Sequence, residues 1–158
     1  MMTSIPFPNE YILIASIDIV GVPRAGGSKI AGIGSRSGRL FVRPASPLTA
    51  EWRSACSVAA NVAFCGTLLT CPLHVEYIFL FPRPKSHFRT GKKASLLRLD
   101  APVFVSCKPD LTKLVRSTED AMTGIIWKDD AQVVSSTAHK RYCLSTESAG
   151  ANVRIYKT

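Results

Sequence analysis

Residues 108–134 read KPDLTKLVRSTEDAMTGIIWKDDAQVV and predict a helix, a turn and the start of a strand. Between Asp110 and Gly124 the apolar positions follow the i, i+3, i+4 spacing of one helix face, at Leu111, Leu114, Val115, Thr118 and Met122. Asp110 suits the N-cap of this helix, and Gly124 is the residue type that ends one. We expect a tight loop over Ile125–Asp130 and a strand over Ala131–Leu144.

The rest of the chain adds strands, basic loops and a second helix. The composition of Pro47–Phe64 predicts a core helix, with Thr49 as a candidate cap. Gly21–Gly38 and Pro82–Cys107 are expected to be basic loops, the first of them mobile. Strands are expected at Tyr11–Val20, Arg39–Arg43, Leu73–Phe81 and Ala151–Tyr156. This order predicts an α+β fold: one domain over residues 1–158, with a small mixed sheet and two main helices packed on it.

Positive charge dominates the composition and indicates a polyanionic partner. The 158 residues include 20 Lys and Arg against 11 Asp and Glu, a formal net charge of +9. Basic side chains on a small domain favour phosphate binding, through counterion release. We expect the phosphate contacts to come mainly from the two loops and the start of the second helix: Lys29, Arg36, Arg83, Lys85, Arg89, Lys92, Lys93, Lys108 and Lys113.

Several other classes of protein do not fit the sequence. Five cysteines without a CxxC pair fit neither a disulfide framework nor a zinc site. Residues 1–9 do not resemble a secretory signal, and residues 55–75 are too polar for a membrane span. Gly27 stands where a P-loop requires lysine. We therefore expect a soluble cytoplasmic protein with no membrane partner and no small-molecule cofactor.

Acidic residues gather where the second helix and the next strand lie. Asp110 begins the helix, and Asp129 and Asp130 precede the strand. If the helix packs back on the sheet, we expect the strand's start to approach the helix's start. Carboxylates that meet there would suit Mg²⁺ or Mn²⁺. Taken singly, Asp110 is better explained as an N-cap and the other two as a polar turn. If Asp110 and Asp130 lay on opposite sides of the molecule, beyond reach of a common ion, this would contradict the metal hypothesis and any catalytic function that depends on it.

Three pieces of this region resemble the signature of the RusA family of Holliday junction resolvases. They are KPDL at 108–111, DAMTG at 120–124 and WKDDAQVV at 127–134, where the family pattern runs roughly K-P-D-x-D-N-L-x-K, D-A-L-x-G and W-x-D-D-A-Q-V. A looser similarity lies in Gly27-Ser28-Lys29 and in Trp52-Arg53. The resemblance implies a Mg²⁺-dependent homodimeric endodeoxyribonuclease that nicks two opposed strands of a four-way junction during recombination and repair. Family members are often carried by bacteriophages and prophages.

The resemblance also implies roles for individual residues. Asp110 and Asp130 match catalytic, metal-binding aspartates, with Asp129 supporting or sharing the role of its neighbour. Arg116 stands at the place of a catalytic lysine, where it would hold phosphate as a fork. Thr112 stands where the family has a second aspartate, so a neutral hydroxyl replaces an anionic metal ligand. Lys113 replaces an asparagine.

These departures leave other functions open. One is a nuclease that prefers flaps or replication forks to four-way junctions. Another is a weakly active or non-catalytic protein that binds branched DNA, because Thr112 and Arg116 replace the usual acid and lysine. An RNA-binding domain of ribosomal type is disfavoured, because the strands lack aromatic residues at the spacing of a stacking surface.

Overall fold

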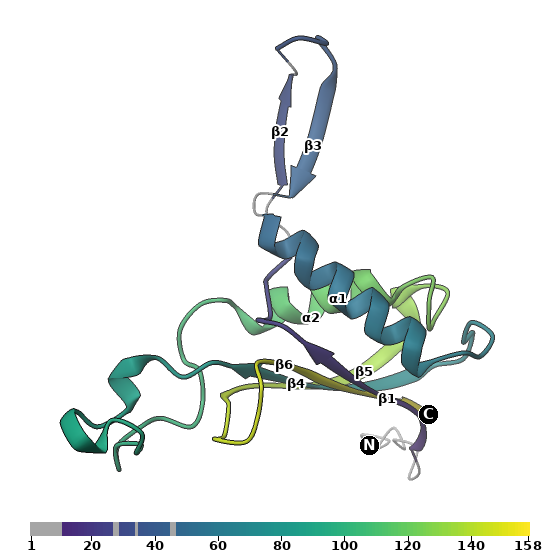
Figure 1. Ribbon diagram of the computed structural model, residues 1–158. Coiled ribbons are helices and arrows are strands. Elements are labelled where there is room, and N and C mark those ends of the chain that lie inside the picture. The colour runs from purple at the N-terminus through teal and green to yellow at the C-terminus, as the bar shows by residue number, and fades with distance from the viewer. Residues whose placement is uncertain (1–10, 27–28, 34, 45–46) are drawn as a thin grey trace, which may run out of the picture.

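The computed structural model describes residues 11–26, 29–33, 35–44 and 47–158. Four strands form the main sheet in the order β1-β6-β4-β5 (Figure 1). The edge pair β4 and β5 is parallel, and the other two pairs are antiparallel. This is the mixed sheet that the sequence predicts. The strands span β1 Ile12–Val20, β4 Leu73–Phe81, β5 Val133–Tyr142 and β6 Gly150–Lys157.

Both long helices, α1 over Pro47–Ala63 and α2 over Leu111–Met122, pack on one face of this sheet (Figure 1). Helix α1 turns Trp52, Cys56 and Ala60 inward, at the four-residue spacing of a single face. The strands contribute alternate residues to the same core, which also includes the buried Trp127 at the end of the turn after α2. The two-helix, mixed-sheet α+β fold is thus confirmed.

The two helices are joined by polar contacts as well as by the core. Arg53 of α1 forms an ion pair with Asp120 of α2, and the Ser57 hydroxyl donates to the Ala121 carbonyl at 2.9 Å. Thr49 is not the cap that we expected, because α1 begins two residues earlier, at Pro47. Its hydroxyl donates instead to the Ala25 carbonyl at 3.2 Å and holds the segment after β1 against the helix.

A two-stranded hairpin projects from the body beyond the start of α1 (Figure 1). Strand β2, Lys29–Ile33, pairs antiparallel with β3, Leu40–Pro44. The expectation of a loop over the whole of Gly21–Gly38 is therefore wrong, because five of its residues pair with the strand that follows. The glycines of this segment suggested a loop, but Gly38 serves the hairpin turn, where φ is 62°.

Residues 82–107 form a second projection and contain two 3₁₀ turns, Lys85–His87 and Gly91–Lys93. Backbone pairing between Phe88 and Leu97 closes this loop on itself. Its far end returns to β5, where the Val105 amide donates to the Lys140 carbonyl at 3.3 Å. The predicted long basic loop is thus present and locally ordered. Within the described ranges, no helix has the length and apolar character needed to cross a bilayer.

Candidate active site

Asp110 stands at the first turn of α2 with its carboxylate turned away from the helix end. Its backbone is extended, as at an N-cap, but its side chain accepts no capping hydrogen bond. The carboxylate instead pairs with the Lys113 ammonium, 3.1 Å away, and the Asp110 side chain is 52% exposed. The pKa of Asp110 lies below its ordinary value, mainly because of the Lys113 ammonium and to a smaller extent because of Lys108 and Lys140. The carboxylate is therefore charged, accessible and surrounded by cations.

Two contacts fix the position of this helix start. The Lys140 ammonium, from near the end of β5, donates to the carbonyls of Cys107 at 2.7 Å and Pro109 at 2.8 Å. On the other side, the Gly26 amide donates to the Lys113 carbonyl at 3.0 Å. A Cβ at Gly26 would lie 3.0 Å from the Ser117 Cβ, so this close approach favours glycine. Asp110 is thus held beside the end of β5.

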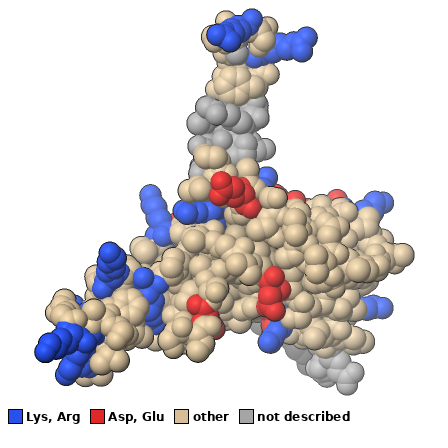
Figure 2. Space-filling view, in the orientation of Figure 1, with Lys and Arg blue, Asp and Glu red and all other residues tan. Residues whose placement is uncertain are grey.

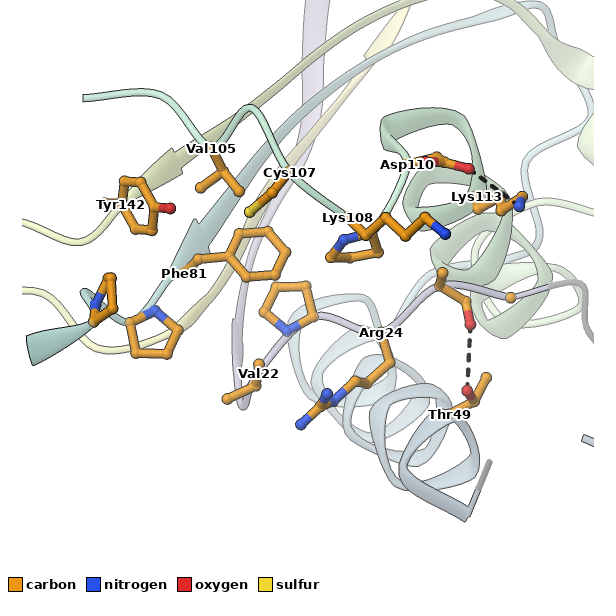
Figure 3. A pocket seen from close by; sticks show the side chains of 16 residues that line it. Val22, Arg24, Thr49, Phe81, Val105, Cys107, Lys108, Asp110, Lys113 and Tyr142 are labelled. Carbon is orange, nitrogen blue, oxygen red and sulfur yellow. Dashed lines mark hydrogen bonds and ion pairs between the residues drawn. The ribbon is translucent and has the colours of Figure 1, made fainter. Parts of the chain in front are cut away.

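A cavity of about 740 Å³ opens beside Asp110 (Figure 3). Residues 22–26 form one wall, the two ends of the 82–107 loop with Phe81 and Tyr142 form another, and Thr49 and the start of α2 complete the lining. Lys108 extends toward the Asp110–Lys113 pair, whereas the Phe81 ring and the Tyr142 side chain lie at the other end (Figure 3). One end of the cavity is therefore ionic and the other is apolar.

Asp129 and Asp130 occupy the 3₁₀ turn that leads into β5. Asp129 caps this turn: its carboxylate accepts from the Ala131 amide at 2.9 Å, and its own amide donates to the Gln132 side chain at 2.9 Å. Gln132 also donates to the Leu69 carbonyl at 2.8 Å. The polar-turn interpretation therefore accounts for Asp129, and Asp130 is the exposed acid beside it.

The structure does not bring Asp110 and Asp130 together within one chain. Asp110 is tied to Lys140 near the end of β5, whereas Asp130 comes just before the strand begins at Val133. The strand from Val133 to Lys140 alone spans roughly 23 Å. The expectation that Asp110 and Asp130 meet is wrong, because a helix followed by a short turn places the start of the next strand beside the end of the helix. No cluster of three or more potential metal ligands (His, Cys, Asp or Glu) occurs in the described ranges.

The acidic neighbours of Asp130 lie on the last turns of α2 instead. Glu119 is partly buried and accepts a 2.9 Å hydrogen bond from the Tyr77 hydroxyl of β4. Burial raises the pKa of Glu119, the Tyr77 bond opposes that rise, and the charges of Asp130 and Asp120 add to it. Glu119 was not among the predicted site residues, although the short turn after α2 brings the start of β5 to the end of the helix that carries it. Helix periodicity places it on the face of Thr112 and Arg116, and its bond to β4 is a tertiary contact.

Thr112 and Arg116 are exposed on the half of α2 that begins next to Asp110. Asp120, one helical turn after Arg116, forms its ion pair with Arg53 of α1 and not with Arg116. Thr112 and Arg116 are thus accessible to a ligand at the helix start.

The nine basic residues expected to bind DNA differ in how far the structure leaves them available to a ligand. Arg83 is engaged within the protein: it donates to the carbonyls of Cys143 at 3.0 Å and Pro102 at 2.9 Å and stacks on the Tyr142 ring. The Lys29 side chain lies outside the described part of the structure. The other seven are accessible to varying degrees, with Arg89 the least exposed: Arg36, Lys85, Arg89, Lys92, Lys93, Lys108 and Lys113. Figure 2 shows basic side chains gathered at the tip of the hairpin and over the 82–107 projection.

Comparison with known proteins places the chain in a family. The family model described as "Endodeoxyribonuclease RusA" matches residues 27–156. A curated protein of Bacillus subtilis (strain 168), YqaN, described as uncharacterized, is 33% identical over 81 residues. That alignment covers 48% of this chain and 53% of YqaN. The family match spans the hairpin, both helices, the cavity lining other than residues 22–26, and all the acidic residues discussed above. The chain therefore belongs to the RusA family of endodeoxyribonucleases.

Proposed function

We propose that the protein is a structure-selective endodeoxyribonuclease that resolves four-way DNA junctions as a homodimer. The family match over residues 27–156 carries this proposal. The exposed Asp110 supports it, because it is an acidic residue set among Lys108 and Lys113, between two basic projections. Exposed cations position the phosphate backbone by charge, without reading base sequence. Recognition of junction shape rather than sequence is therefore the expected mode of binding.

The separation of Asp110 from Asp130 supports a centre shared between two copies. Strand β5 is at the edge of the sheet, and in the described ranges its outer edge is covered only near Arg141, by Phe104. If two β5 strands pair antiparallel about a two-fold axis, the Asp130 end of one copy lies beside the Asp110 end of the other. This arrangement produces two equivalent centres, as two opposed nicks require.

The residues of one chain do not by themselves fit a divalent cation. Asp110 and the acidic group of Glu119 and Asp130 lie at opposite ends of α2, and no set of three ligands meets in the described ranges. In the shared arrangement, carboxylates from both copies would supply the oxygen donors that Mg²⁺ or Mn²⁺ prefers. Thr112 would contribute at most a neutral hydroxyl. Arg116, on the same half of α2, would hold a phosphate oxygen.

The test is cleavage of a synthetic four-way junction with and without Mg²⁺ or Mn²⁺. We expect paired nicks in the junction and no cutting of linear duplex. Asp110→Asn and Asp130→Asn should each abolish nicking and leave junction binding within about three-fold, because removing an acid does not weaken phosphate contacts. A double variant that still nicks junctions would overturn the assignment. Competing flap and fork substrates against the junction tests the nuclease alternative.

One observation favours a second function, binding of branched DNA without cleavage. The Lys113 ammonium neutralises Asp110, and the residue that the family uses as a further acid is Thr112 in this chain. The Thr112→Asp variant separates the two functions. A large gain in nicking from a near-zero baseline would show that the natural protein is a binder. Appreciable nicking by the unaltered protein supports the nuclease.

A further inference from the structure

The cavity beside Asp110 has the size and polarity of a site for one organic group that carries a phosphate. Its volume of about 740 Å³ lies in the range of small-ligand sites. The apolar end is formed by the accessible Val22 and by the largely buried Phe81 and Val105, with the Tyr142 hydroxyl pointing toward Cys107 (Figure 3). Aromatic and aliphatic surfaces of this kind accept the flat faces of nucleobases without regard to sequence.

The opposite end of the cavity has the charge that a phosphate requires. Lys108 and Lys113 line it, against the carboxylate of Asp110, which is already paired with Lys113, whereas the Arg24 guanidinium points away from that pair (Figure 3). The Lys108 side chain extends from the cavity wall toward that pair (Figure 3). A ligand with a planar apolar part and an anionic part a few ångströms away therefore matches the cavity from end to end.

The cavity also lies where DNA held by the two basic projections would pass. One wall, residues 22–26, is the segment that leads into the hairpin, and the ends of the 82–107 loop form another. At the crossover of a branched molecule, stacking between neighbouring bases is interrupted, so a base can leave the stack at lower cost than in a continuous duplex.

We propose that this cavity receives one nucleotide, unstacked at the branch point of the DNA, with its base against Phe81 and Tyr142 and its phosphate on Lys108 and Lys113. This inference rests on the proposed function, because it takes branched DNA as the ligand. It adds a binding site for a single base and makes that site a determinant of junction recognition. The phosphate next to the inserted base is thereby placed beside Asp110.

The experiment scans 2-aminopurine through the positions next to the crossover of a four-way junction, with cleavage blocked by EDTA. We expect binding to raise 2-aminopurine fluorescence at one position and not in linear duplex. Replacing that nucleotide with an abasic site should weaken binding by the wild-type protein about ten-fold, the order of effect that aromatic stacking of one base gives.

A substitution that fills the cavity can be compared with the same substitution elsewhere on the surface. Val22 is 37% exposed, so Val22→Trp has room to enter the cavity, and Val62→Trp makes the same change at a residue 77% exposed near the end of α1. We expect Val22→Trp to lose the fluorescence change and to bind intact and abasic junctions equally. Val62→Trp should behave as wild type. If Val22→Trp fails to fold, the abasic comparison on the wild-type protein decides the matter.

The outcomes separate this inference from the proposed function. Fluorescence change without cleavage in Mg²⁺ or Mn²⁺ would support the nucleotide site and overturn the nuclease. Cleavage with unchanged fluorescence at every position, and with Val22→Trp as active as Val62→Trp, would support the nuclease and overturn the nucleotide site. Displacement of the junction by micromolar deoxynucleotide monophosphate would assign the cavity to a free nucleotide and overturn the inference.

Discussion

The ion pair between Asp110 and Lys113 controls the charge of the acid on which the proposed chemistry depends. Lys113 is the main reason that the pKa of Asp110 lies below its ordinary value. We expect Lys113→Gln to raise the pKa of Asp110, as measured by NMR titration of the carboxyl carbon, and to move the acidic limb of the nicking rate to higher pH. Lys92→Gln, an exposed change in the 82–107 loop, is the control. An unmoved Asp110 titration would contradict the ion pair.

The carboxylate of Glu147 predicts how the free energy of unfolding depends on pH. Arg141 and the Leu144 amide hold Glu147 and lower its pKa from 4.5 to about 2. Because the pKa is lowered in the folded state, the contact stabilises the protein above about pH 4.5, and this contribution is lost as the pH falls toward 2. We expect Glu147→Gln to cost about 1 kcal/mol at pH 7, or roughly 2–4 °C in Tm.

Thermal unfolding of wild type and Glu147→Gln between pH 7 and pH 2 checks this expectation. The difference in Tm should shrink as the pH falls, since protonated Glu147 no longer attracts Arg141. Glu51→Gln changes an exposed glutamate that forms no ion pair in the described ranges and should leave Tm nearly unchanged at every pH. A difference for Glu147→Gln that stays constant down to pH 2 would contradict the shifted pKa.

Single residues were well predicted where their role is local. Asp129 caps its turn, and Asp110 occupies the N-cap position of α2 although its side chain accepts no capping hydrogen bond, because both positions depend on the backbone within three residues. Predictions failed where a partner comes from another element. Arg53 pairs with Asp120, and Arg83 is bonded to backbone carbonyls of Pro102 and Cys143. Nothing in the sequence around an arginine tells whether its partner is a phosphate or its own chain.

At the scale of elements, the hairpin β2–β3 is the part of the molecule whose contribution to DNA binding is easiest to test. Arg36 and Arg39 are exposed at its turn (Figure 2), away from the acidic residues of the body. We expect the Arg36→Ala, Arg39→Ala double variant to weaken junction binding and to reduce the slope of log affinity against log salt by about 2, one for each lost phosphate contact. Binding titrations at several salt concentrations measure this slope.

Arg154→Ala is the matched control for the hairpin variant. Arg154 is exposed on β6, where strand alternation turns it to the sheet face opposite the helices. Its loss should leave the salt slope unchanged. If both variants lower the slope equally, the positive charge acts through the whole molecule and the hairpin has no special part in binding.

The elements themselves were largely predictable, and their mutual placement was not. Strand β4 has the predicted bounds, and α1 ends one residue earlier than expected, because both have clear periodicity. Strand β2 was missed because five residues beside several glycines carry little pattern. The direction of α2 relative to β5 follows from the short turn between them, and applying that constraint would have placed Asp130 beside Glu119 rather than Asp110.

At the scale of the whole molecule, the separation of Asp110 from Asp130 makes the proposed site incomplete in a single copy. The free stretch of the β5 edge offers a surface through which a second copy would complete it. This accounts for the acidic residues that are divided between the ends of α2, and it matches the two-fold symmetry of the proposed four-way junction substrate. A monomer would then bind phosphate through its basic projections and cut nothing.

Mixing two inactive variants tests the shared centre most directly. In a dimer of one Asp110→Asn chain and one Asp130→Asn chain, one centre carries both substitutions and the other carries neither. After subunit exchange in an equal mixture, about a quarter of all centres should be intact, so nicking of a four-way junction should return to about a quarter of the wild-type rate. A mixture as inactive as either variant alone would contradict the shared centre.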